Sequence, residues 1–320
     1  MRALDATWIA FVALVASLAA CGDAGGGAGG AKLVVGFSQI GAESDWRAAE
    51  TRSIQDEAQA RGIELRLADA QGKQENQIRA LKSFVAARVD AIVLAPVIET
   101  GWDKVLGDVA AAGIPVVLVD RGVQVLDPSL YATLIASDFV EEGRMAARWL
   151  VEATKGKCKL VELQGTVGSA PALERQRGFL EVLAAEPGME VLLTQSGEFT
   201  RAKGKEVMEA FLKARGDEIQ AVYAHNDDMA LGAIQAIEAY GKKPGSEVLV
   251  VSIDAVKAAF EAMVAGKLNA TVECNPLLGP LVFDAIEKLA RGEQVEKKLI
   301  VQDRLFTRET AAAELPKRKY

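Results

Sequence analysis

The segment Ile114-Pro-Val-Val-Leu-Val-Asp-Arg121 joins an apolar run to a pair of opposite charges. A continuous apolar run of this length is typical of a parallel strand that is buried on both faces of its sheet. In open α/β sheets, ligands bind outside the carboxyl ends of the strands. Asp120 and Arg121 are therefore placed to bind something polar.

Similar polar groups stand at the ends of other strand-like runs, at Asp69, Asn226 and Asp254. The carboxyl ends of parallel strands meet at one edge of a sheet, so these groups are expected to gather there. The repetition indicates a built site instead of a chance arrangement.

From Lys32 onward, strand-like runs alternate with helical stretches. In the first half we expect strands over 33–38, 63–67, 91–95 and 115–119, and helices over 46–61, 74–87 and 102–112. A second series follows Asp138, with helices over 141–154, 171–185, 202–214 and 228–240, and strands over 160–163, 191–193, 221–224 and 248–253. Such alternation predicts right-handed βαβ units and parallel sheets.

The chain has 320 residues, which suits two domains, and it supplies enough hydrophobic residues, 50%, for two cores. We predict an α/β fold of two doubly wound parallel-sheet lobes joined by a multi-strand hinge. The N-terminal lobe is expected to comprise residues 32–137 plus 274–302, and the C-terminal lobe residues 138–273 plus 303–320. Strand-like segments near 136–138, 273 and 302 are the hinge candidates, and such hinges let two lobes close over a ligand.

Composition excludes several classes of function. With 37 Lys+Arg against 44 Asp+Glu, the net charge of −7 gives no basic footprint for nucleic acid. The single histidine and the absence of Cys/His spacing leave no material for a metal site. No phosphate loop, dinucleotide fingerprint or nucleophile elbow is present, so we expect no cofactor and no catalytic residue. His225 is interpreted as a strand-end histidine with local hydrogen bonds.

The first 31 residues differ in composition from the rest of the chain. An apolar stretch over 8–20 ends in Leu18-Ala-Ala-Cys21, and a Gly-rich segment follows to residue 30. This pattern predicts a signal peptide with a lipobox, lipidation of Cys21 and a flexible tether, hence a periplasmic or extracytoplasmic lipoprotein that meets the membrane only through its anchor. An ordinary signal peptide with an incidental cysteine is the alternative. Cys158 and Cys274 are expected to be buried free thiols.

The candidate site residues suit a neutral polyol. The two oxygens of a carboxylate, or the parallel donors of a guanidinium, match pairs of adjacent hydroxyl groups, and an aromatic ring packs on an apolar sugar face. Asp, Asn, Arg and Trp are therefore the diagnostic residue types.

Six segments carry a resemblance to a known family, namely residues 36–50, 73–78, 119–121, 161–165, 199–209 and 223–229. The chain resembles the type I periplasmic solute-binding proteins of bacterial sugar ABC transporters, of the ribose and galactose type, and within them the galactofuranose binders. The similarity covers essentially everything after Lys32, and residues 43–47 are its most specific part.

The resemblance implies a ligand site divided between the lobes. In the first lobe it implies that Trp46 packs on the sugar ring and that charged groups bind its hydroxyls. The implied ligand-binding residues are Glu43, Trp46, Arg47, Asp120, Arg121, Arg175, Phe199, Asn226, Asp254 and Glu273. The alternative for Glu43 to Arg47 is a capped, solvated helix start with Asp45 as N-cap. Cys274 departs from the family pattern and leaves the local hinge geometry open.

The resemblance further implies a monomer that delivers a monosaccharide, galactofuranose-like, to an ABC transporter permease by closing its lobes. A sensor or chemoreceptor partner for another sugar or furanosyl compound is the alternative within the fold. A sugar-repressor regulator would need a helix-turn-helix, which residues 1–31 do not supply. A glycoside-processing enzyme is the remaining alternative.

Overall fold

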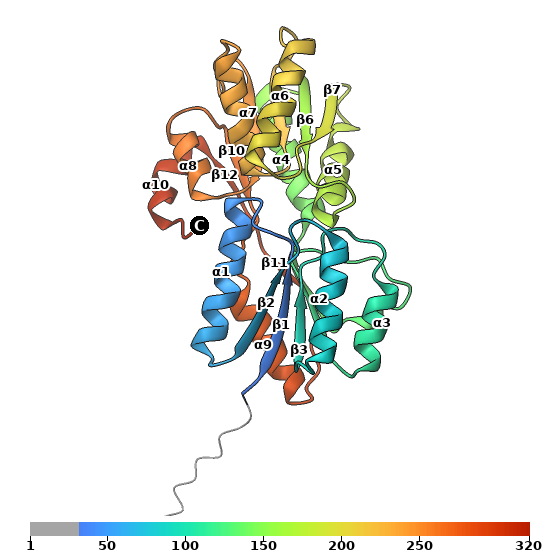
Figure 1. Ribbon diagram of the computed structural model, residues 1–320. Coiled ribbons are helices and arrows are strands. Elements are labelled where there is room, and N and C mark those ends of the chain that lie inside the picture. The colour runs from blue at the N-terminus through green and yellow to red at the C-terminus, as the bar shows by residue number, and fades with distance from the viewer. Residues whose placement is uncertain (1–31) are drawn as a thin grey trace, which may run out of the picture. The chain divides into compact units, whose positions relative to one another are not determined.

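The computed structural model describes residues 32–320 (Figure 1). The signal peptide, the lipidation of Cys21 and the Gly-rich tether lie outside the described residues.

A first sheet of six strands has the order β11-β5-β4-β3-β1-β2, and every neighbouring pair is parallel. Its strands are β1 (Val34–Gln39), β2 (Glu64–Asp69), β3 (Ala91–Leu94), β4 (Val116–Val119), β5 (Thr133–Ser137) and β11 (Lys298–Val301). β3 and β4 are buried throughout, as their apolar sequences predict.

Helices cover both faces of this sheet (Figure 1). They are α1 (Asp45–Ala60), α2 (Gln74–Ala86), α3 (Asp103–Ala111) and α9 (Gly279–Ala290), and a short 3₁₀ helix spans Pro128–Leu130. Ile54 of α1 and Phe283 of α9 pack with Val93 in one core cluster. Leu81 of α2 and Leu106 of α3 share another with the opposite face. This first lobe is therefore doubly wound.

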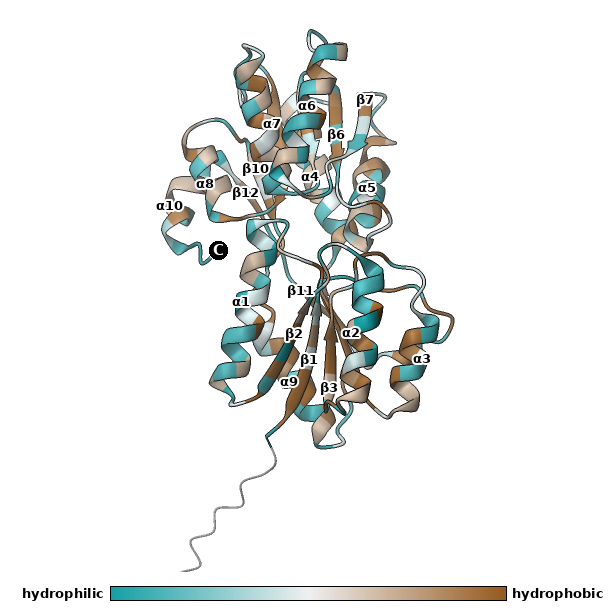
Figure 2. Ribbon diagram, in the orientation of Figure 1, coloured by the Kyte–Doolittle hydropathy of each residue, from teal (hydrophilic) through white to brown (hydrophobic). Residues whose placement is uncertain are grey.

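The second sheet has the order β12-β10-β9-β8-β6-β7 and is parallel except that β12 is antiparallel to β10. Its strands are β6 (Lys157–Gln164), β7 (Gly188–Ser196), β8 (Ala221–Ala224), β9 (Leu249–Asp254), β10 (Ala270–Glu273) and β12 (Leu305–Thr307). Its helices are α4 (Phe139–Thr154), α5 (Ala170–Leu183), α6 (Arg201–Arg215), α7 (Asp227–Ala239), α8 (Lys257–Val264) and α10 (Arg308–Glu314), followed by a 3₁₀ helix, Leu315–Lys317. Figure 2 shows apolar strands beneath helices whose outer faces are polar.

The chain passes between the two sheets at three places: from β5 to α4, from β10 to α9, and from β11 to β12. Both sheets direct the carboxyl ends of their parallel strands toward the region between the lobes, where the candidate site residues lie. The fold is the one predicted. The exact lobe boundaries, 32–137 plus 274–302 and 138–273 plus 303–320, stay a prediction.

Candidate functional site

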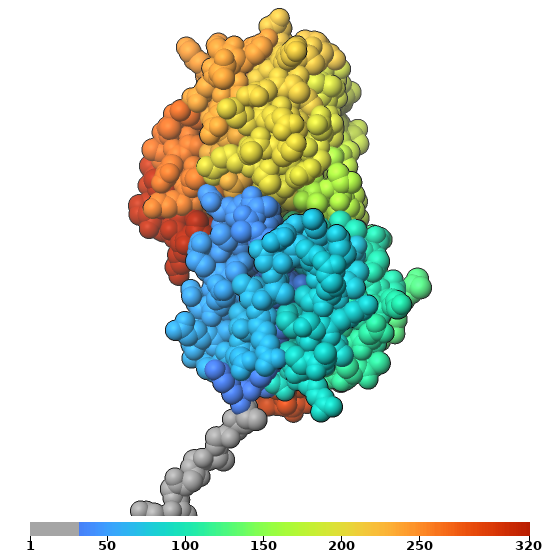
Figure 3. Space-filling view, in the orientation of Figure 1, coloured from blue at the N-terminus to red at the C-terminus, as the bar shows by residue number. Residues whose placement is uncertain are grey.

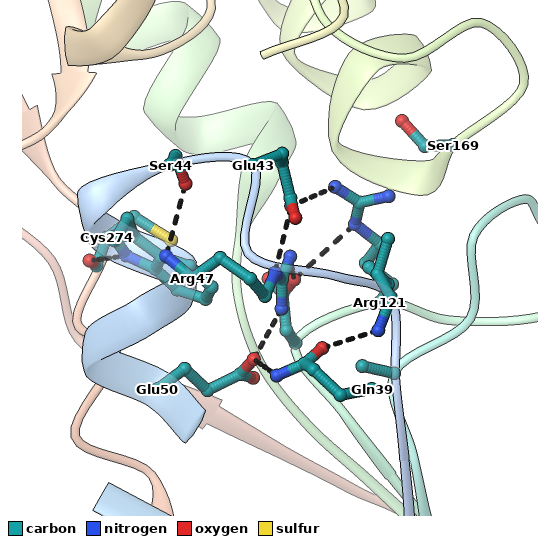
Figure 4. Close-up of polar contacts among 12 residues, drawn as sticks. Gln39, Glu43, Ser44, Arg47, Glu50, Arg121, Ser169 and Cys274 are labelled. Carbon is teal, nitrogen blue, oxygen red and sulfur yellow. Dashed lines mark hydrogen bonds and ion pairs between the residues drawn. The ribbon is translucent and has the colours of Figure 1, made fainter. Parts of the chain in front are cut away.

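A cavity between the lobes gathers nine of the ten predicted ligand residues. Its lining comprises Glu43, Ser44, Trp46, Arg47, Asp120, Arg121, Pro171, Arg175, Phe199, Asn226, Asp254 and Cys274. Figure 4 shows that the first-lobe side chains converge from the start of α1 and from the loop after β4.

Arg47 is the centre of the first-lobe half of the site. Ser44, and not the Asp45 of the alternative interpretation, is the N-cap of α1, because its hydroxyl accepts from the Arg47 backbone N–H at 3.1 Å. The buried guanidinium then pairs with Glu43 at 3.1 Å, with Asp120 at 2.6 Å and with Glu50 (Figure 4). The solvated helix start offered as the alternative is thus wrong for Arg47, which is 2% exposed.

Burial and these charges shift the titration of the cluster. Burial acts to lower the pKa of Arg47, but the three carboxylates outweigh it and raise that pKa well above its usual value. Burial raises the pKa of Glu50 to about 7. Arg47 therefore stays cationic, and its position is set by acids on two different elements.

Arg121, in contrast, has hydrogen-bonding capacity to spare. Its Nη1 donates to the Val97 carbonyl at 3.2 Å, while its carboxylate neighbours are farther away, Asp120 at 3.5 Å and Glu43 at 3.9 Å. Arg121 Nε and Glu43 Oε2 are buried without a hydrogen-bond partner. Buried polar groups are almost always paired, so this corner offers a donor and an acceptor to a ligand. Burial lowers the pKa of Arg121 to about 10.

Arg175 is the corresponding cation of the second lobe. Its Nε donates to Glu142 at 2.7 Å, its Nη1 donates to the His225 carbonyl at 2.6 Å, and its Nη2 lies 3.7 Å from Asp254. Burial raises the pKa of Asp254 well above the usual value, although Arg175 opposes this. Arg177, also on α5, is a surface residue with its side chain 59% exposed.

The Phe199 ring packs against the backbone of Gly165. A Cβ at Gly165 would lie 1.9 Å from the Phe199 ring, so only glycine lets the ring approach β6 this closely. The amide of Asn226 donates to the Phe199 carbonyl at 3.0 Å, and its oxygen caps α7 by accepting from Met229 N–H at 3.0 Å. Asn226 thus lines the cavity while it also positions Phe199.

Trp46 lines the cavity next to the connection between β10 and α9. Its Nε1 donates to the Cys274 carbonyl at 2.5 Å, and the Arg47 guanidinium lies 4.7 Å from its ring centroid. One ring face is thus covered by a cation of its own lobe.

Glu273 is the exception among the predicted ligand residues, because it does not line the cavity. Its carboxylate accepts from Arg318 at 3.0 Å and lies 3.6 Å from Arg304. Adjacent residues of an extended segment point to opposite sides, so Cys274 takes the cavity-facing place. Both Cys274 and Cys158 are buried free thiols, as predicted.

Two predicted strand-end groups have other surroundings. Asp69 lines a neighbouring hollow with Gln71 instead of this cavity. His225 is buried and pairs with Glu162 at 3.0 Å, while its other ring nitrogen accepts from Gly165 N–H at 3.3 Å. Burial lowers the pKa of His225. These are the local hydrogen bonds expected of it.

The backbone is unusual at three cavity residues. Asp120, Phe199 and Asp254 have φ angles of 62°, 60° and 124°. Residues other than glycine rarely adopt positive φ, and such strain concentrates at functional sites. No sequence pattern indicated it. Within residues 32–320 no cluster of three or more His, Cys, Asp or Glu could hold a metal ion, and no helix has the length and apolarity to cross a membrane.

Comparisons with known proteins agree with this geometry. A family model described as "Periplasmic binding protein domain" matches residues 35–294. The chain belongs to the periplasmic binding protein family. It is 50% identical over 293 residues to the galactofuranose-binding protein YtfQ of Escherichia coli (strain K12), covering 90% of this chain and 92% of that protein.

Two solved structures are also similar to this chain. One is the binding component of the arabinose ABC transporter from Shewanella sp. ANA-3 bound to α and β-L-arabinofuranose, with 53% identity, a TM-score of 0.87, and coverage of 89% of this chain and 95% of that one. The other, from Mycobacterium smegmatis in complex with β-D-fucofuranose, has 47% identity, a TM-score of 0.88, and coverage of 90% and 95%.

Proposed function

We propose that this chain is an extracytoplasmic binding protein that encloses one furanose monosaccharide between its lobes and delivers it to an ABC transporter permease. The carrying observation is the buried cavity in which Arg47, Asp120 and Arg121 of one lobe face Arg175 and Asp254 of the other. Paired donors and acceptors of this kind match adjacent hydroxyl groups on a sugar.

The polar lining of the cavity supports a small hydroxylated ligand. The unpaired Arg121 Nε and Glu43 Oε2 supply hydrogen bonds that a hydroxyl could complete. Phe199 supplies an apolar face. Binding, rather than catalysis, is what such a site performs.

The relatives favour the five-membered ring form, because the names of three similar proteins mention galactofuranose, L-arabinofuranose and D-fucofuranose. Closure is the signal for delivery in this proposal. Since the ligand contacts both lobes, it favours their closed arrangement over an open one. We further propose that the protein acts as a monomer held near a membrane by the lipid on Cys21.

Isothermal titration calorimetry tests the proposal. L-arabinose and D-galactose should each bind with a saturable heat and change the intrinsic tryptophan fluorescence, because Trp46 lines the cavity. myo-Inositol is the matched control, since it offers similar hydroxyls on a carbocycle that cannot form a furanose. Absence of binding by every aldose would contradict the proposed function, and equal affinity for myo-inositol would contradict the furanose assignment.

A further inference from the structure

A polar contact between the lobes lies outside the cavity. The backbone N–H of Asp45, the first residue of α1 in the first lobe, donates to Asp228 Oδ2 of the second lobe at 2.9 Å. Neither residue lines the cavity. The first N–H groups of a helix have no partner within it. Here a carboxylate of the second lobe accepts the hydrogen bond of one such N–H group of the first lobe.

Arg201, the first residue of α6, completes this contact. Its guanidinium donates to Asp228 Oδ1 at 2.7 and 3.0 Å, and to Asp45 Oδ2 at 3.2 Å. A cation of the second lobe therefore separates two carboxylates that would otherwise repel each other across the cleft. Figure 3 shows the blue end of the first lobe against the yellow surface of the second.

The second-lobe half of the contact is rigid. A Cβ at Gly232 would lie 2.1 Å from the Arg201 carbonyl, and one at Gly204 would lie 2.6 Å from the Met229 Cα. The helices α6 and α7 therefore pack backbone to backbone, which fixes Arg201 against Asp228. The Asp228 side chain is buried, at 6% exposed.

We propose that Asp45, Arg201 and Asp228 form an interlobe latch that sets the affinity of the protein for every ligand without touching any of them. The measured affinity depends on the free energy of lobe closure as well as on the sugar contacts. Breaking the latch then weakens the binding of all ligands by one common factor. This inference rests on the proposed function.

The start of α1 offers a selective test. Proline is favoured at the first position of a helix, and the preceding Ser44 has φ −147° and ψ 161°, the extended conformation that a residue before proline prefers. Asp45→Pro therefore keeps the helix but removes the N–H that Asp228 accepts. Asp45→Ala is the matched control, because it keeps that N–H and loses only the exposed ion pair with Arg201.

We expect Asp45→Pro to weaken binding of L-arabinose roughly 10- to 100-fold, the range for a lost hydrogen bond to a charged group. Asp45→Ala should weaken it only a few-fold. Calorimetry gives the affinities, and stopped-flow fluorescence should show faster release with little change in association. Equal affinities for the two variants, at equal melting temperatures, would overturn the latch.

Arg201→Gln tests the same latch from the second lobe. It should weaken the binding of L-arabinose and of D-galactose by the same factor, so that the ratio of the two affinities stays at the wild-type value. Arg177→Gln is the control, because the Arg177 partner, Glu174, is on the same helix at 3.8 Å. A changed ratio, or an effect no larger than that of Arg177→Gln, would contradict the proposal.

Amide hydrogen exchange on the wild-type full chain separates the latch from the proposed function. If no monosaccharide bound, the proposed function would fail, while protection of the Asp45 amide in the ligand-free chain would still show that the contact between the lobes forms. Protection of this amide, which no residue of its own helix provides, is the expected result. Exchange at the rate of an unprotected amide in the chain saturated with L-arabinose would overturn the latch while leaving the proposed function in place.

Discussion

The two arginines of the first lobe have different roles. Arg47 is held by three carboxylates, whereas Arg121 has two ion-pair partners at 3.5 and 3.9 Å and an Nε that donates no hydrogen bond. Removing one partner of a buried ion pair leaves an uncompensated charge and is strongly destabilising. Arg47 is thus part of the fold as well as of the site, while Arg121 is available mainly to the ligand.

Alanine variants should separate these roles. We expect Arg121→Ala to weaken sugar binding by about 1.5–3 kcal/mol, the range for hydrogen bonds to charged groups, with little loss of stability. Arg47→Ala should weaken binding by roughly 2–4 kcal/mol and also lower the free energy of unfolding by about 3–5 kcal/mol. Calorimetry and urea unfolding measure the two quantities. A stable Arg47→Ala variant would show that Glu50 and Asp120 find other partners.

Gly165 is a second residue-scale test, because Phe199 occupies the space of its missing side chain. Gly165→Ala should displace Phe199 and weaken sugar binding, and it should cost stability by about 1–3 kcal/mol as an overpacked substitution. A double-mutant cycle with Phe199→Ala checks the cause, since the second substitution should remove most of the penalty of the first. Additive effects would assign the loss to the Gly165 backbone instead.

The sequence predicted which residue types meet at the site but not how they pair. Asp120, Arg121 and Asp254 were predictable because polar residues at strand ends face one edge of a parallel sheet. Glu50 and Glu142, which hold Arg47 and Arg175, were not, because an acid within a helix gives no sign of its tertiary partner. Ser44 was within reach, since serine before an amphipathic run is an N-cap signal.

At the scale of elements, the regular βαβ series was predictable, but the C-terminal part was not. The predicted helix over 74–87 corresponds to α2 at Gln74–Ala86, and the strand over 221–224 to β8. No helix was predicted over α8, α9 or α10. The strands β11 and β12 have only four and three residues, and they flank the strand-like hinge segment that was predicted near residue 302.

The crossing of α4 and α5 positions Arg175. A Cβ at Gly143 of α4 would lie 2.2 Å from the Arg175 carbonyl, and one at Gly178 of α5 would lie 1.9 Å from the Val140 carbonyl. Both helices therefore meet at backbone contact. This closeness brings the Arg175 guanidinium to Glu142 at 2.7 Å, so the second-lobe site depends on two glycines that never touch the cavity.

Gly143→Ala tests this dependence. It should lower the free energy of unfolding by about 1–3 kcal/mol, because the helices must separate, and it should weaken sugar binding by moving Arg175. Gly107→Ala in α3 is the matched control, since nothing lies within 4 Å of its added Cβ. That variant should gain up to about 1 kcal/mol from helix propensity. Thermal unfolding and calorimetry give both comparisons, and equal stability of the two variants would exclude backbone contact at Gly143.

At the scale of the whole molecule, each lobe presents half of a charged site, and three connections join the lobes. Two acids outside the cavity have raised pKa values, the fully buried Asp227 and the half-buried Asp303. Burial raises the pKa of Asp227 to about 7 and, with the nearby Glu142 charge, that of Asp303 to about 8. Asp303 lies between β11 and β12, within one of the connections. The folded state therefore favours the protonated form of these two acids.

The raised pKa values of these acids make the stability of the protein depend on pH. An acid whose folded pKa is raised binds its proton more tightly in the folded chain, so its stabilisation is complete below the unfolded pKa near 4 and is lost as pH rises through the folded value. The lowered pKa of His225 opposes this, but only below its unfolded pKa of about 6.5. The window from pH 6.5 to 8 therefore isolates the acids.

In that window we expect the free energy of unfolding to fall as pH rises, by at most about 1.4 kcal/mol per pH unit for each titrating acid. Asp303→Asn mimics the neutral form, so it should reduce the slope between pH 7 and 8, where Asp303 titrates. Urea unfolding at half-unit pH steps measures both curves. A wild-type stability that rises through this window would mean that the acids are ionised in the folded protein and that cations such as Arg175 stabilise them more than burial penalises them.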